Sequence, residues 1–335
     1  MEEQKPAPTV SVVLCTFNGA AYVAQQLGSI LTQTRPVDEL VIADDGSTDD
    51  TVDVVDATIA EHAARHPGSL PRLVRLSGDR PLGVAANFER AMRAATADLL
   101  ALCDQDDVWH PTRVERMLAS FDAEPSTALV HGDARLVDAA GSDLGSTLFG
   151  ALGLSARERA EIAAGDEFAA LLRRNLVTGA TTMLRADVRD RALPIPEGWI
   201  HDEWIAMVAA ATSVTSLVDE ALLDYRQHGA NQIGVQRITL TARLDRLRQP
   251  RQPRNARLLV RARSLVERLA RLEGVAPERL ALARRKFAHE GRRSALPAAR
   301  LLRVAGVLEG ALRGDYTRFG GGAQDALRDL VQPAS

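Results

Sequence analysis

The residues best suited to chemistry lie in the segment 99–109, where an apolar run leads directly into acidic side chains. Leu99–Cys103 is followed by Asp104, Asp106 and Asp107. Such a run predicts a buried strand, and open α/β sheets bind ligands at the carboxyl ends of their strands. Closely spaced carboxylates repel one another, and Mg²⁺ or Mn²⁺ can relieve that repulsion through oxygen ligands. The segment therefore predicts a divalent metal site that also holds phosphates.

A second acidic turn follows another predicted strand, Glu39–Ala43. Asp44 and Asp45 come directly after it, and Gly46 then permits a tight turn into a helix that begins at Thr51. Capping this helix needs only one acid or hydroxyl group. The paired carboxylates are therefore expected to contact a ligand, such as a base edge or a ribose hydroxyl.

The elements that must position these turns alternate along the first half of the chain. The predicted strands are Val10–Cys15, Glu39–Ala43, Arg72–Leu76, Leu99–Cys103 and Ala128–Val137. The predicted helices are Ala20–Gln33, Thr51–His66, Asn87–Ala95 and Pro111–Ala123. This alternation predicts right-handed crossovers and an α/β fold with a Rossmann-like, doubly wound, mostly parallel sheet.

Charge is distributed unevenly along the 335 residues, whose net charge is −3. Residues 236–335 contain 22 Lys and Arg against 9 Asp and Glu, whereas the rest of the chain contains 19 against 35. Beyond about residue 234 the pattern changes to Arg-, Leu- and Ala-rich helices separated by prolines. We therefore predict a catalytic domain over residues 1–235 and a basic helical accessory region over residues 236–335.

The basic region has two open interpretations, a solvated face or contact with an anionic membrane. Arginines such as Arg284, Arg285, Arg292 and Arg293 would supply membrane contacts. Nucleic acid is not expected as a partner, because aromatic residues are not interleaved with the basic ones and no recognised motif is present. The polar N-terminus does not resemble a signal peptide, and no apolar run is long enough to span a membrane. The expected location is cytoplasmic, with peripheral attachment to the inner face of the plasma membrane as an open option.

Several motifs, taken in order, resemble those of bacterial family-2 glycosyltransferases, which are inverting enzymes with the GT-A fold. They are Cys15–Gly19, Asp44–Asp49, Leu82–Asn87, Asp104–Trp109, Thr178–Ala180, His201–Trp204 and Tyr225–Gly234. Two later segments, Gly314–Tyr316 and Asp329–Leu330, resemble the rhamnosyltransferase-like branch of the family. The resemblance extends over nearly the whole chain.

This resemblance implies a metal-dependent transfer of a sugar from a nucleotide diphosphate to a glycan or lipid-linked glycan, in cell-surface polysaccharide synthesis. The leading donor is dTDP-rhamnose, and the alternative is a UDP-hexose. By position, the residues implied to bind the donor are Thr16, Asn18, Asp45, Asn87, Asp104 and Arg226. Asp106 and His228 would bind Mg²⁺ or Mn²⁺, Gly179 and Trp204 would contact the acceptor, and Asp202 would be the general base.

Three alternatives stay open. Glu203 could replace Asp202 as the base, because neighbours on a helix point about 100° apart and only one can face the acceptor. Asp104 and Asp106 also fit the first motif of haloacid-dehalogenase-type phosphatases, which need a later lysine, and the chain has only Lys5 and Lys286. Finally, a non-enzymatic nucleotide-sugar-binding protein would be expected to lack the base or the metal-binding Asp, and both are present.

Overall fold

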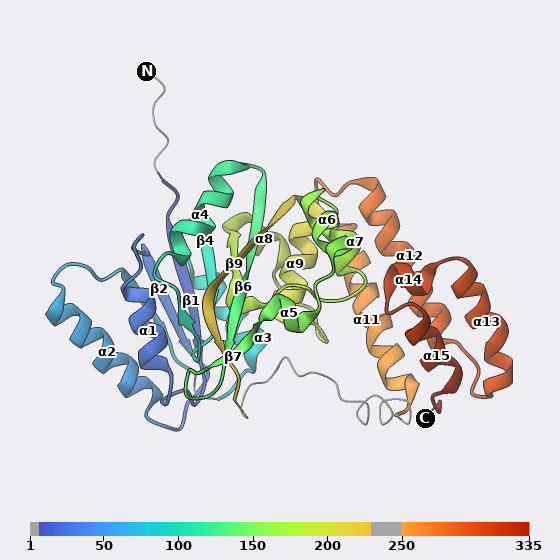
Figure 1. The fold of residues 1–335 in the computed structure, drawn as a ribbon, viewed down its shortest axis with the longest axis horizontal. Helices are drawn as coiled ribbons and strands as arrows, with labels where there is room; N and C mark the ends of the chain where they lie inside the picture. Colours follow the sequence, from blue (N-terminus) through green and yellow to red (C-terminus); the bar gives the residue numbers. More distant parts are fainter. Residues whose placement is uncertain (1–6, 79, 229–248, 335) are drawn as a thin grey trace, which may run out of the picture.

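In the computed structural model, which describes residues 7–78, 80–228 and 249–334, a nine-stranded sheet runs through the first two thirds of the chain (Figure 1). Its first part has the strand order β3-β2-β1-β4, and every pair in it is parallel. These strands are β1 (Val10–Thr16), β2 (Glu39–Asp44), β3 (Arg72–Leu76) and β4 (Leu99–Cys103). They are connected by α1 (Val23–Leu31), α2 (Thr51–Arg65) and α3 (Val84–Ala94). The predicted β-α alternation is confirmed here.

The second part of the sheet is mixed. Beyond β4 the order continues β8-β6-β9-β5, and β7 pairs with the C-terminal end of β6, past the stretch that pairs with β8. These strands are β5 (Val108–Trp109), β6 (Thr127–Val137), β7 (Asp143–Thr147), β8 (Thr182–Arg185) and β9 (Val214–Arg226). β8 runs antiparallel to both β4 and β6, whereas β9 runs parallel to β6. The α/β class is confirmed, and the parallel arrangement holds from β1 to β4.

Helices cover both faces of this sheet. Alternate residues of β1 serve the two faces, since Val13 and Cys15 belong to one apolar cluster and Val12 and Leu14 to the other. The remaining helices of this part are α4 (Arg113–Ala123), α5 (Leu148–Leu152), α6 (Ala156–Ala163), α7 (Glu167–Leu171), α8 (Ala186–Ala192) and α9 (His201–Thr212), with a 3₁₀ turn at Gly179–Thr181. Because β1, β2 and β4 run parallel to one another, their carboxyl ends lie together at one edge of the sheet.

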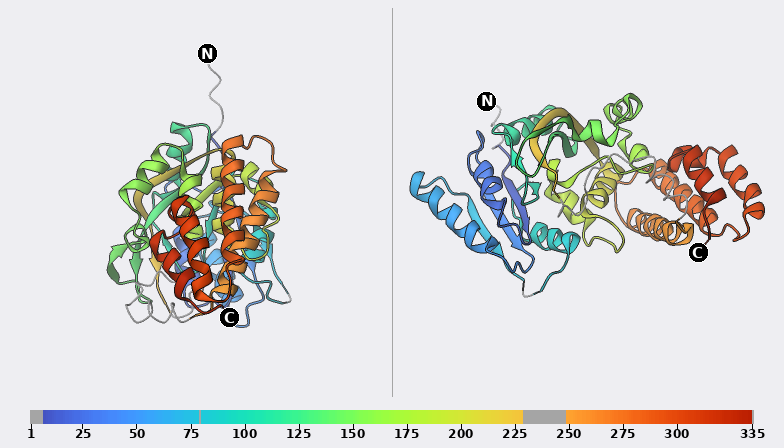
Figure 2. Two further views of the ribbon diagram at one scale, coloured as in Figure 1. Left: turned by 90° about the vertical axis from the view of Figure 1, so that its right-hand side faces the viewer. Right: turned by 60° about the horizontal axis from the view of Figure 1, so that its bottom comes forward.

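The C-terminal helices lie at the end of the molecule opposite α2 (Figures 1 and 2). They are α11 (Arg251–Leu269), α12 (Pro277–Ser294), α13 (Arg300–Leu312), α14 (Asp315–Phe319) and α15 (Ala323–Val331). Leu265 and Leu269 of α11 share one apolar cluster with α9. The helical region is thus packed onto the sheet part. The predicted boundary near residue 235 lies outside the described residues.

Much of the basic charge in this region is paired internally. Arg293 is buried between Glu290 and Asp329, to which it forms ion pairs at 3.0 and 2.6 Å. Arg285 and Arg292 both bind the buried carboxylate of Asp315. Arg293 is therefore buried by its ion pairs, whereas the side chains of Arg285 and Arg292 stay partly exposed beside Asp315, and membrane contact by these arginines stays a prediction. No helix of the described residues is long and apolar enough to cross a membrane.

Candidate active site

The loop after β4 carries three carboxylates in different surroundings. Asp104 lies beside Asp106 and Asp202, and burial together with those two charges raises the pKa of its carboxyl to about 7. Asp107 accepts a hydrogen bond from the backbone N–H of Arg226 at 3.0 Å, and burial raises its pKa well above the usual range. Mutually repelling carboxylates at a strand end are a charge arrangement that a cation would neutralise.

Asp106 and His228 lie together, as the metal prediction requires. Nε2 of His228 is 2.8 Å from Oδ2 of Asp106, and the side chains keep 11% and 16% of their surface exposed. The ring of Tyr22 stacks on His228 at 4.8 Å and fixes its plane. An oxygen and a nitrogen donor at this spacing fit a divalent cation. Within the described ranges, no three His, Cys, Asp or Glu side chains form a complete metal site.

Arg226, which is predicted to contact the donor, is buried, with 3% of its surface exposed. Its Nε donates to the carbonyl of Asp106 at 2.8 Å, and its two terminal nitrogens donate to Ala139 O and Gln25 Oε1. The guanidinium therefore holds the end of β9 against the Asp106 loop and α1. Its charge acts on the site through the position of Asp106, and direct contact with the donor stays a prediction.

The turn after β2 is cross-linked by its acids. Asp45 accepts the backbone N–H groups of Leu82 and Gly83, both at 2.8 Å, and so fixes the loop that leads into α3. Thr16, at the end of β1, donates its hydroxyl to Asp44 at 2.8 Å. The structure thus brings the predicted donor-binding residues Thr16 and Asp45 to one edge of the sheet, where each also ties two loops together.

The two predicted asparagines differ from each other. Asn18 has φ = 48° and accepts the N–H of Thr48 at 2.8 Å, so it joins the β1 and β2 turns at the site. Asn87 is buried under β2, where its amide donates to Ala43 O at 2.8 Å and accepts from Arg90 at 2.7 Å. The amide of Asn87 therefore docks α3 on the sheet, and its contact with the donor stays a prediction.

Asp202 lies in the first turn of α9, beside the acidic loop. Its Oδ2 accepts the N–H of Gly179 at 2.9 Å, and its Oδ1 accepts the N–H of Glu203 at 2.6 Å. Glu203 turns the other way and forms an ion pair with Arg261 of α11. Of the two adjacent acids, Asp202 is therefore the one whose charge reaches Asp104.

The tryptophans are core residues. Trp204 is fully buried, donates its indole N–H to Ala192 O at 2.7 Å and packs against Trp199 with ring centroids 5.2 Å apart. Trp109 is also buried, beneath the guanidinium of Arg113. The expectation that Trp204 contacts the acceptor is wrong, because this helix position faces the α8–α9 core.

Comparison with known proteins identifies the sheet region. The model of glycosyl transferase family 2 matches residues 11–174. Residues 11–174 are therefore similar to family-2 glycosyltransferase domains. An uncharacterized glycosyltransferase of Nostoc sp. is 31% identical over 122 residues, which is 36% of this chain and 35% of the relative. Chondroitin synthase of Escherichia coli is 32% identical over 138 residues, which is 41% of this chain and 19% of that protein. The match thus spans about a third or less of these relatives.

Solved structures resemble the chain over almost its full length. S. aureus TarS 1–349 in complex with UDP-GlcNAc has a TM-score of 0.58 at 14% identity, covering 96% of this chain and 89% of that one. A mannosyltransferase from Pyrobaculum calidifontis in complex with GDP-Man and Mn²⁺ has a TM-score of 0.50 at 19% identity, covering 96% and 79%. At these identities the likeness concerns the fold, which is GT-A, with the C-terminal helices included in the match.

Two residues of the candidate site carried no predicted role. Tyr225 lies among the acids, and burial together with Asp104 and its neighbours raises the pKa of its phenol. His201 stacks on Phe88 with ring centroids 3.9 Å apart, and burial lowers its pKa, which keeps the imidazole neutral. Each directly precedes a predicted site residue, Arg226 or Asp202, so its position beside a polar motif is the signal that could have identified it.

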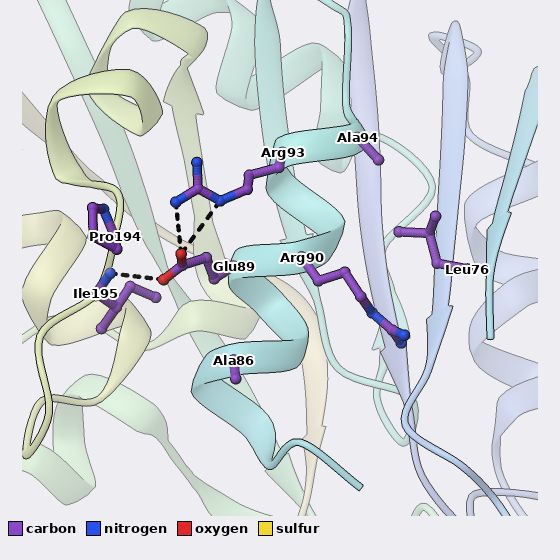
Figure 3. A pocket seen from close by; sticks show the side chains of 8 residues that line it. All are labelled: Leu76, Ala86, Glu89, Arg90, Arg93, Ala94, Pro194 and Ile195. Carbon is purple, nitrogen blue, oxygen red and sulfur yellow. Dashed lines mark hydrogen bonds and ion pairs between the residues drawn. The ribbon is translucent and has the colours of Figure 1, made fainter. Parts of the chain in front are cut away.

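The phosphatase alternative requires a later lysine, and Lys286 is the one that lies within the described residues. Lys286 ion-pairs with Glu290 at 2.8 Å inside the helical region, and Lys5 lies outside the described residues. A groove of about 680 Å³ runs along α3 and is lined by Leu76, Ala86, Glu89, Arg90, Arg93, Ala94, Pro194 and Ile195 (Figure 3). Its acid Glu89 accepts from Arg93 and from the N–H of Ile195. None of the catalytic candidates lines this groove.

Proposed function

We propose that this chain is an inverting, metal-dependent glycosyltransferase that moves a sugar from a nucleotide diphosphate to a hydroxyl of a glycan or lipid-linked glycan. One observation carries the proposal: Asp104, Asp106, His228 and Asp202 gather at the carboxyl edge of a family-2 domain. Open α/β sheets bind ligands at this edge, where the four side chains would supply the charges that a nucleotide sugar and a nucleophilic hydroxyl need.

Asp202 is the proposed general base. Its carboxylate removes the proton of the acceptor hydroxyl, the oxygen attacks the anomeric carbon, and the bond from that carbon to the diphosphate breaks on the opposite face. The two backbone N–H groups that hold this carboxylate fix its orientation. Preorganisation of this kind avoids rearrangement during the reaction.

Asp106 and His228 are the proposed protein ligands of Mn²⁺ or Mg²⁺. Bound there, the cation would neutralise charge on the diphosphate leaving group. The mannosyltransferase of similar fold was crystallised with GDP-Man and Mn²⁺, which supports the assignment. Asp104, Asp45, Thr16 and Asn18 line the neighbouring strand ends, where we propose that the nucleoside binds.

The proposal for the donor has two parts, the class of compound and the particular sugar nucleotide. A nucleotide diphosphate sugar is supported by the family match, and TarS, of similar fold, binds UDP-GlcNAc. The motif resemblance favours dTDP-rhamnose, whereas the solved neighbours favour a UDP-hexose or another hexose donor. With a lipid-linked acceptor, the enzyme would work at the inner face of the plasma membrane.

A panel of nucleotide sugars decides between these donors. Thermal unfolding is measured with Mn²⁺ and dTDP-rhamnose, UDP-glucose, UDP-GlcNAc or GDP-mannose, and the true donor is expected to raise Tm most. A ligand at one hundred times its Kd stabilises the folded state by about 2.7 kcal/mol. Release of the nucleoside diphosphate in the presence of acceptor glycans then separates an enzyme from a binding protein. Failure of every nucleotide sugar to raise Tm contradicts the proposal.

Gly179 offers a test of the base geometry. A Cβ at this position would lie 2.7 Å from Nε2 of His201 and 3.4 Å from Cβ of Asp202. Because His201 is held flat against Phe88, Gly179→Ala is expected to displace Asp202 and lower kcat by on the order of 10–10². Gly28→Ala is the matched control, since its Cβ meets nothing within 4 Å. Wild-type kcat in Gly179→Ala would show that Asp202 does not depend on this contact.

A further inference from the structure

One helix of the C-terminal region presents an apolar face to solvent. Leu301 and Leu312 of α13 are 87% and 89% exposed, and Leu308 and Val304 are also exposed. At 3.6 residues per turn, these four positions lie on one side of the helix. We call this set, Leu301, Val304, Leu308 and Leu312, the α13 stripe.

The opposite side of α13 is fixed by packing. Arg303, Val307 and Gly310 are buried on that side, toward α14 and α15. Arg303 donates to the carbonyls of Pro297 and Gln332 at 2.7 and 2.6 Å. The helix therefore cannot rotate to bury its leucines without breaking these bonds, and the stripe is a stable outer surface.

Positive charge surrounds the stripe. Among the exposed residues of α13, α14 and α15 and of the turns between them, Arg300, Arg313 and Arg318 are basic and Glu309 is acidic. Glu309 is already paired with Arg313 at 2.6 Å. Residues 249–334 as a whole contain 18 Lys and Arg against 8 Asp and Glu, and Asp315, Asp329 and Glu290 are buried. The surface left to a partner is therefore apolar with a basic rim.

The small area of the stripe favours a lipid surface over a second copy of the chain as its partner. A helix of 13 residues is about 20 Å long and about 10 Å wide, so one face covers about 200 Å². A stable protein interface needs about 800 Å² from each partner, which this face alone does not provide to a second copy. A lipid surface requires no matching shape, and it accepts leucines between acyl chains with arginines at the headgroups.

We propose that the α13 stripe binds the surface of an anionic lipid bilayer, with α13 lying in the plane of the membrane interface and Arg300 and Arg318 beside the headgroups. α13 lies at one end of the molecule (Figures 1 and 2), and the exposure of the stripe leaves it accessible to a flat surface. The inference rests on exposure and charge and not on the proposed transfer reaction, so either can fail while the other stands.

Flotation of the full chain with vesicles tests the proposal. The chain is expected to bind vesicles of phosphatidylcholine that contain about 30% phosphatidylglycerol, and to bind pure phosphatidylcholine much less. Raising the salt concentration to about 0.5 M should release it, because the Debye length falls well below its value of about 10 Å at 0.1 M. Leu301→Ser/Leu312→Ser should lower the partition coefficient at least about tenfold, since two fully exposed leucines no longer enter the acyl region.

The control is Val52→Ser/Leu144→Ser, which removes two exposed apolar side chains from α2 and β7. It should bind vesicles like the wild type, and circular dichroism should show the same thermal unfolding for both variants. Absence of wild-type binding to anionic vesicles, or unchanged binding of the stripe variant, overturns the proposal. So does a dimer in analytical ultracentrifugation that the stripe variant converts to monomer, because the stripe would then be an interface between copies.

Discussion

Replacing Asp202 by Asn is expected to lower kcat by on the order of 10²–10⁴, the usual cost of losing a general base. The amide keeps the size of the carboxylate but cannot take the proton of the acceptor hydroxyl. Asp202 accepts backbone N–H groups of Gly179 and Glu203, and the Asn oxygen can still accept one of them, so the variant should keep its fold and its donor affinity. Steady-state kinetics with acceptor, together with donor titration, measure both quantities.

Glu203→Gln is the matched control, because it neutralises the adjacent acid on the same helix. Glu203 faces Arg261, and burial raises its pKa, so its loss should affect stability more than kcat. The base assignment is exchanged if Glu203→Gln is inactive and Asp202→Asn is active. Equal losses in both variants would indicate that the N-terminus of α9, and not one carboxylate, is the sensitive element.

The parts of the fold that sequence predicts well are those with local signals. β1, β2 and β4 are short apolar runs that end at Gly-, Ser- or Asp-rich turns, so both their existence and their ends can be predicted. β8 has only four residues, and β9 carries exposed acids at Asp219 and Glu220 in its middle. Periodicity has little to detect in these two strands, which are stabilised by pairing with other strands: β8 with β4 and β6, and β9 with β6 and β5.

The candidate site divides in a similar way. Carboxylates at strand ends could be predicted from sequence, because parallel strands bring their carboxyl ends to one edge. The contacts of Arg226, Asn87 and Trp204 could not be predicted, because their partners are distant in the sequence and only the fold brings them near. Arg226 donates a hydrogen bond to Gln25, whereas Trp204 packs against Trp199 and donates to the carbonyl of Ala192. Residue type alone does not distinguish a polar side chain that binds a ligand from one that braces a loop.

Removal of the divalent cation is expected to abolish transfer. Activity should be lost in excess chelator and return with Mn²⁺ or Mg²⁺, because the carboxylates of Asp104, Asp106 and Asp202 repel one another and a cation relieves that repulsion. Asp106→Asn should lower kcat/KM by on the order of 10², which corresponds to about 2.7 kcal/mol of transition-state stabilisation. Full activity in chelator contradicts the metal-dependent mechanism.

His228→Gln isolates the second proposed ligand. It removes the imidazole that lies 2.8 Å from Asp106, and it should weaken Mn²⁺ binding about tenfold or more, as measured by electron paramagnetic resonance with nucleoside diphosphate present. His66→Gln, on the exposed end of α2, is the control and should leave Mn²⁺ binding unchanged. Excess Mn²⁺ should restore much of the activity of His228→Gln if the imidazole is a ligand. Lost activity with unchanged Mn²⁺ affinity would instead make His228 a positioning residue that holds Asp106 against Tyr22, because such a role affects geometry without affecting metal affinity.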